Sequence, residues 1–186
     1  MDRILLSDHS NEKLADSVKK RYTTQRTLKN GFNVTFRPIE CTDHAEFKEF
    51  FKALSPASVH FRFLEIIKDI SNEAIERYCD LDYNQEMAIV ALLKGESKII
   101  AVARLMLSLE HKKGEFALVI ADALQGLGLG TELLAYLIKI ARDYQLEELY
   151  CTLSSDNVKM IGLGEKFGLK VKSTDGDTRE MTLKLT

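Results

Sequence analysis

Cysteine and histidine are scarce in this sequence of 186 residues, with three and four copies respectively. Cys41, Cys79 and Cys151 are odd in number and form neither a C-x-x-C motif nor a pattern of paired cysteines and histidines. A disulfide framework is therefore not expected, and a reducing, cytoplasmic compartment is the simplest prediction. No metal site is expected either, because the four histidines are scattered along the chain.

Long apolar runs and an excess of either charge are also lacking. No segment of 18 consecutive apolar residues occurs, and the first residues include no continuous apolar stretch of the kind found in secretory signals. The net charge is −2 and the pI is about 6.1, whereas binding to nucleic acid needs a basic face. We therefore expect no membrane span, no signal peptide and no nucleic-acid partner.

The length and the hydrophobic content of 45% suit one domain with an ample core. Residues 1–30 are polar and carry only a weak helical stripe at Leu6, Leu14 and Val18. We assign them to an N-terminal extension that is partly helical or disordered, and we assign the domain itself to residues 31–186. The apolar patterns of the domain predict the order β-α-α-β-β-β-α-β-α-β-β, with hairpin turns at residues 94–97 and 175–177.

Three glycines within five residues separate a predicted strand from a predicted helix. The strand is the aliphatic run 116–121, and the helical stripe extends from Leu129 to Ala141. A glycine-rich turn at a helix N-terminus leaves several backbone N–H groups unpaired and pointing one way. The segment therefore predicts a pyrophosphate site, because glycines let the anion approach and the helix dipole favours its charge.

The spacing of this loop excludes two common nucleotide sites. The glycines lie too far along the chain for a dinucleotide fold, and no Gly-Lys-Ser/Thr follows as in nucleoside-triphosphate loops. Gln125-x-x-Gly128-x-Gly130 instead resembles the acyl-CoA loop of the GNAT superfamily of N-acetyltransferases. A glycine-rich turn without a ligand is the alternative. The resemblance implies acetyl-CoA as co-substrate, bound by Gln125, Gly126, Leu127, Gly128, Leu129, Gly130 and Thr131.

A second GNAT signature lies one predicted strand downstream. Asn157-x-x-Met-x-x-Leu-Gly164-x-x-x-Gly168-Leu169 is similar to the family pattern Asn-x-x-Ala-x-x-Leu-Tyr-x-x-x-Gly-Phe. The resemblance implies that Asn157 contacts the pantetheine arm of the cofactor, while a helix N-cap would also suit this residue. Gly164 replaces the tyrosine that many members use as a general acid, so the group that protonates the leaving thiolate stays open.

The upstream half narrows the resemblance to one subgroup. Residues 36–39, Leu54-Ser55-Pro56-x-Ser58-x-x-x-Arg62-Phe63, residues 82–91 and residues 101–105 are similar to the catalytic domain of Pat-type protein lysine acetyltransferases. Those enzymes acetylate acyl-CoA synthetases and other proteins, and their domain also lacks the tyrosine. The resemblance implies an α/β GNAT fold, with a mixed, mostly antiparallel sheet flanked by helices. It places acyl-CoA at the splay between the fourth and fifth predicted strands.

Acetyl transfer to an amine needs a general base, because a lysine with a pKa near 10.4 is protonated at pH 7. Glu115 is the candidate, since many family members place a catalytic glutamate on this strand. The alternative for Glu115 is a solvated strand-end residue that pairs with Lys113.

Two weaker carboxylate candidates precede Glu115 in the sequence. Asp82 and Glu86 precede the second predicted strand and could attract a cationic acceptor, although surface charge or turn capping explains them equally well. The resemblance also implies that a backbone N–H near Val119 and Ile120 meets the developing oxyanion.

These features predict an acetyl-CoA-dependent N-acetyltransferase, monomeric or homodimeric, that acetylates a protein lysine by direct attack with Glu115 as base. A small-amine acceptor, such as a polyamine, amino acid or antibiotic, is the first alternative. A non-catalytic acyl-CoA-sensing module is the second. Between residues 42 and 80, Phe47, Phe50, Phe51 and Phe61 favour a core over a substrate pocket.

Overall fold

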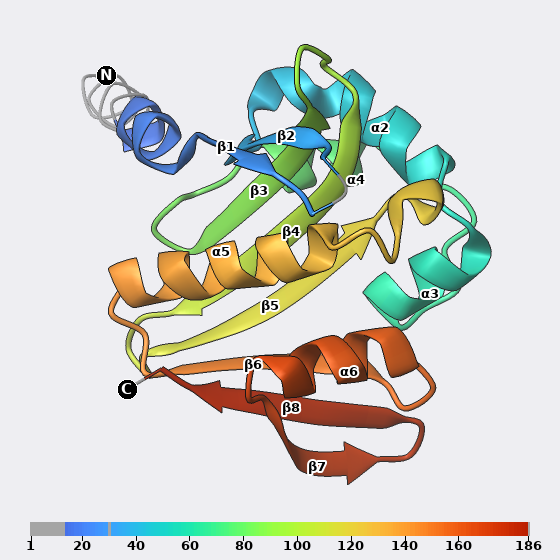
Figure 1. The fold of residues 1–186 in the computed structure, drawn as a ribbon, viewed down its shortest axis with the longest axis vertical. Helices are drawn as coiled ribbons and strands as arrows, with labels where there is room; N and C mark the ends of the chain where they lie inside the picture. Colours follow the sequence, from blue (N-terminus) through green and yellow to red (C-terminus); the bar gives the residue numbers. More distant parts are fainter. Residues whose placement is uncertain (1–13, 30, 186) are drawn as a thin grey trace, which may run out of the picture.

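A computed structural model describes residues 14–29 and 31–185 of the chain. Eight strands form one sheet in the order β1-β2-β3-β4-β5-β6-β8-β7 (Figure 1). Neighbouring strands are antiparallel except for β5 and β6, which are parallel. The strands are β1 (Thr24–Thr27), β2 (Asn33–Pro38), β3 (Glu86–Leu93), β4 (Ile99–Ser108), β5 (Lys113–Ile120), β6 (Glu148–Ser154), β7 (Lys170–Asp175) and β8 (Thr178–Lys184).

Helices cover both faces of this sheet, over two separate apolar cores. The long helix α5 and the short helix α6 pack on one face, and α2, α3 and α4 pack on the other. Among the described residues, no helix has the length and apolar character needed to cross a bilayer. The helices are α2 (His44–Lys52), α3 (Pro56–Phe63), α4 (Asn72–Cys79), α5 (Leu129–Asp143) and α6 (Val158–Lys166), with 3₁₀ turns η1 (Cys41–Asp43) and η2 (Asp122–Leu124).

The predicted fold class, a mixed and mostly antiparallel sheet flanked by helices, is confirmed. The hairpin turns fall where they were expected, between β3 and β4 and between β7 and β8. One boundary differs, because β5 spans Lys113–Ile120 instead of the predicted residues 116–121. The turn before it includes Lys112, which adopts a φ of 50°.

Part of the predicted N-terminal extension packs on the domain. Residues 14–22 form a helix, in which Val18 and Tyr22 are 7% and 2% exposed. The Tyr136 hydroxyl of α5 donates to the Tyr22 carbonyl at 3.0 Å. Strand β1, which the sequence did not predict, pairs with β2. Leu6 lies outside the described residues, and the division at residue 30 stays a prediction.

Candidate active site

Strands β5 and β6 diverge after a short stretch of pairing. Their parallel ladder joins residues 113–115 to residues 148–150 and goes no further. Beyond it, β5 stays paired with β4 up to Ile120, and β6 stays paired with β8 up to Ser154. The sheet therefore opens after Glu115 (Figure 1). These are the fourth and fifth strands of the sequence prediction, so the opening lies where the splay was expected.

The ladder between β4 and β5 decides which backbone amides face this opening. The Ala121 N–H donates to the Ile100 carbonyl at 2.9 Å, and hydrogen bonding alternates along an antiparallel pair. Val119 therefore directs its N–H toward β4, and Ile120 directs its N–H and carbonyl toward the opening. The Gln125 side chain donates to that Ile120 carbonyl at 3.1 Å, which agrees with this direction. Of the two predicted oxyanion positions, only Ile120 presents an N–H to the opening.

The glycine loop forms a cradle of backbone N–H groups at the start of α5. Gly126 and Gly128 have φ values of 77° and 91°, which L side chains rarely adopt. No acceptor among the described residues takes the N–H groups of residues 126–131. Leu127 is exposed and Leu129 is buried. A pyrophosphate suits this arrangement, because the N-terminus of the 15-residue helix carries partial positive charge.

Gln125 connects the loop to its surroundings through its side-chain amide. Its Nε2 donates to the Ser58 hydroxyl at 3.0 Å, and its Oε1 accepts from Lys159 at 3.0 Å. Asp122 extends this network by accepting from the Ser55 and Ser58 hydroxyls at 2.6 and 2.8 Å. Ser55 is the N-cap of α3. The start of α3 is thereby fastened to the cofactor loop.

The second signature begins at the N-cap of α6, spans the helix and ends at Leu169, just after its C-cap. Asn157 is the N-cap of this helix, and its Oδ1 accepts from the Met160 N–H at 3.1 Å. The cap therefore uses one side of the amide, and the Nδ2 group remains as a possible donor to a ligand. Gly164 is buried, and a Cβ there would lie 3.2 Å from the end of Met181. The position of the family's tyrosine thus faces the core.

Glu115 lines a cleft of about 490 Å³ on the face of the sheet that carries α3 and α4. Thr152 of β6 and the helix residues Arg62 and Tyr78 line the same cleft. Glu115 is opposite Tyr150 at the last paired position before the strands diverge. Burial and the nearby Glu115 carboxylate raise the pKa of Tyr150, so this phenol stays protonated at neutral pH.

The two weaker carboxylate candidates separate in the structure. Glu86 lines the cleft and forms an ion pair with Arg104, whose Nε and second terminal nitrogen lie 2.8 and 2.7 Å from one carboxylate oxygen. Asp82 lies in the turn before β3, where it accepts from the backbone N–H of Asn84 and from the Gln85 side chain. These bonds hold the pKa of Asp82 below its usual range. Asp82 is not among the residues that line the cleft.

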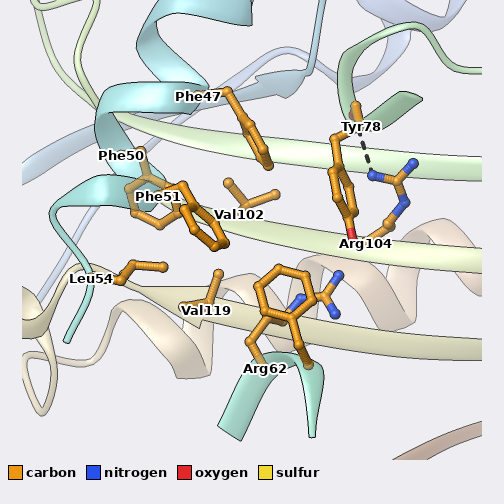
Figure 2. A pocket seen from close by; sticks show the side chains of 10 residues that line it. Phe47, Phe50, Phe51, Leu54, Arg62, Tyr78, Val102, Arg104 and Val119 are labelled. Carbon is orange, nitrogen blue, oxygen red and sulfur yellow. Dashed lines mark hydrogen bonds between the residues drawn. The ribbon is translucent and has the colours of Figure 1, made fainter. Parts of the chain in front are cut away.

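The aromatic side chains of α2 build core rather than a second substrate pocket. Phe47, Phe50 and Phe51 are each 5% exposed and gather over Val102 and Val119 (Figure 2). The cavity that they leave has a volume of about 10 Å³, space for about one water molecule. Glu115 lines the larger cleft and not this small cavity.

Sequence reasoning assigned no site role to Arg62, Tyr78, Arg104 or Thr152, which all line the cleft. Arg104 carried a signal, since it is the one charged residue within the apolar run of β4 and a buried charge needs a partner. Arg62 had a signal only as part of the quoted Pat-type segment. Nothing in the sequence marked Tyr78 or Thr152.

Comparisons with known proteins agree with this geometry. Residues 48–169 match the model of the acetyltransferase (GNAT) family. A named acetyltransferase of Pseudomonas aeruginosa is 38% identical over 136 residues, which cover 72% of this chain and 73% of that protein.

Solved structures share the fold. The GNAT domain of PAT from S. lividans superposes with a TM-score of 0.82 at 21% identity, over 88% of this chain and 97% of that chain. Spermidine N-acetyltransferase from Vibrio cholerae, solved with CoA and spermine, gives 0.69 at 19% identity, over 82% and 95%. Among the described residues, no cluster of His, Cys, Asp or Glu could hold a metal ion. The chain belongs to the GNAT family and is an acetyl-CoA-dependent N-acetyltransferase.

Proposed function

We propose that this enzyme transfers the acetyl group of acetyl-CoA to the ε-amine of a protein lysine, with Glu115 as the general base. The observation that carries the proposal is the place of Glu115. It is the last residue of β5 to pair with β6 before the opening, and its side chain lines the cleft. A carboxylate there lies between the route of the amine and the expected position of the thioester.

Each step of the reaction except protonation of the leaving thiolate has a group of this chain to assist it. The N–H groups of residues 126–131 hold the pyrophosphate, and Asn157 offers its Nδ2 group to the pantetheine arm. Glu115 removes the proton from the lysine ammonium, directly or through a water. The amine nitrogen then bonds to the carbonyl carbon, and the Ile120 N–H meets the charge on its oxygen. The C–S bond breaks, the nitrogen gives up its second proton to water, and the CoA thiolate takes up a proton from water.

Two observations favour a protein acceptor. Met106 lines the cleft and is 46% exposed, so the cleft offers apolar surface to a partner. The resemblance to Pat-type domains points the same way. A small-amine acceptor is the second candidate, because the carboxylates of Glu86 and Glu115 both line the cleft and a neighbour in fold binds spermine.

Release of CoA from acetyl-CoA, measured with competing acceptors, separates the two candidates. The protein acceptor is an acyl-CoA synthetase, and its matched control has the acetylated lysine, located by mass spectrometry, replaced with arginine. The small acceptors are spermidine, lysine and an aminoglycoside. A higher kcat/KM for the synthetase, lost in the arginine control, is the expected result. Turnover of the small amines alone would overturn the protein-acceptor proposal.

A further inference from the structure

The charges that line the cleft do not cancel. Three arginines and two glutamates line it: Arg62, Arg77, Arg104, Glu86 and Glu115. Arg104 and Glu86 neutralise each other in their ion pair. The guanidinium groups of Arg62 on α3 and Arg77 on α4 are therefore left with only one carboxylate, that of Glu115, to balance their charge. A cleft that accepted only a cationic amine would be expected to carry the opposite excess.

Arg62 is the more constrained of these two guanidinium groups. It is partly buried at the C-terminal end of α3, with its guanidinium carbon 4.8 Å from the centre of the Phe63 ring. It forms no hydrogen bond or ion pair with any residue that the structure describes. Burial lowers its pKa, and the nearby Arg104 lowers it further. An arginine in this setting gains most from an anion that enters the cleft.

Arg62 lies at the boundary between the aromatic core and the cleft. It lines both the small apolar cavity and the larger cleft, and Figure 2 shows it at the edge of the aromatic cluster beside Val119. Glu115 is close enough to act on its charge. Arg77, which is exposed at the end of α4, adds a second cation at the same cleft.

We propose that Arg62, assisted by Arg77, binds a carboxylate that lies next to the acceptor amine. This inference rests on the proposed function and names the class of acceptor: an amine with a neighbouring anionic group. The planar guanidinium fork matches a carboxylate with two parallel N–H···O bonds. The carboxylate can come from an acidic residue beside the target lysine or from the α-carboxylate of a free amino acid.

Matched acceptors that differ only in this charge test the proposal. The first pair consists of two peptides with one central lysine and either Glu or Gln at the two positions on each side. The second pair is lysine and lysinamide. The enzymes are wild type, Arg62→Gln, Arg62→Lys and Arg62→Glu, with Arg142→Gln as the control because Arg142 is exposed on the last turn of α5. Thermal stabilisation by acetyl-CoA shows that each variant is folded.

We expect the wild type and Arg142→Gln to prefer the acidic partner by roughly tenfold or more in kcat/KM. Arg62→Gln should lose this preference, Arg62→Lys should keep part of it, and Arg62→Glu should reverse it. The pair that shows the preference identifies the source of the carboxylate. Equal rates within both pairs in the wild type, or an unchanged preference in Arg62→Gln, would overturn this inference alone. No turnover of any amine would overturn the proposed function and this inference with it.

Discussion

Replacing Arg104 with glutamine tests how the wall of the cleft is held. The Arg104 side chain is 8% exposed, and that of its partner Glu86 is 25% exposed. Arg104 also donates to the carbonyls of Arg77 and Tyr78, at 3.3 and 3.2 Å, near the end of α4. Arg104→Gln keeps a polar side chain on β4 but removes the charge. It leaves the Glu86 carboxylate and two carbonyls near the helix end without their donors.

Breaking a buried ion pair from one side costs about 3–5 kcal/mol. Because Glu86 is partly exposed and can rehydrate, we expect about 3 kcal/mol for Arg104→Gln. In a chain of this size, that loss corresponds to a fall in Tm of about 6–12 °C. Urea unfolding gives the free energy, and calorimetry gives the Tm.

Two further variants make the comparison decisive. Adding Glu86→Gln to Arg104→Gln should restore about 1 kcal/mol or more, since no unpaired carboxylate then remains. The control is Lys139→Gln, which breaks an exposed pair with Asp143 on α5 and should cost less than about 1 kcal/mol. A loss in Arg104→Gln as small as that of the control would show that the Arg104–Glu86 pair contributes little to stability.

The remaining predictions concern an aspartate, the thiols and the glycine loop. Burial alone would raise the pKa of Asp122, but the hydrogen bonds from α3 outweigh it and the net pKa lies below its usual range. The wild type should therefore be more stable than Asp122→Asn by its full margin above about pH 4, and this margin should shrink at lower pH. Urea unfolding measures the margin, and a margin that grew on acidification would contradict this prediction. Burial raises the pKa of Cys79 and Cys151 to about 12. Ellman's reagent at pH 8 should therefore modify only Cys41 in the native protein. A second fast-reacting thiol would count against the burial of these two residues. Gly128→Ala places a side chain at a φ of 91° and should lower the stability by about 1–2 kcal/mol. Calorimetric titration should show roughly tenfold weaker binding of acetyl-CoA. Unchanged affinity would exclude a role for this turn.

Local signals made the elements around the glycine loop predictable. The strand, the glycine turn and the helix are contiguous between Glu115 and Ala141, and each has a pattern of its own. In the structure these three segments form β5, the glycine loop and α5. Asn157 was also recognisable, because a helix cap depends on a few neighbouring residues, and the cap is present.

Strand β1 and the cleft depend on contacts that are distant in sequence. Strand β1 has only four residues, Thr-Gln-Arg-Thr, and it is a strand because β2 pairs with it. Arg104 was recognisable as a charge that needs a partner, but the choice of Glu86 follows from the register of β3 against β4. The cleft position of Arg62 depends on how α3 packs against the sheet, which no short pattern encodes.

The most direct test of the central claim compares Glu115→Gln with the wild type in acceptor-dependent CoA release at saturating acetyl-CoA. Glu165→Gln is the control, because Glu165 is exposed on α6 and far along the chain from the strand. With Glu115 as the base, its variant should release CoA at least about 100-fold more slowly, while acetyl-CoA still stabilises it against heat as it does the wild type. Wild-type turnover in Glu115→Gln would contradict the account.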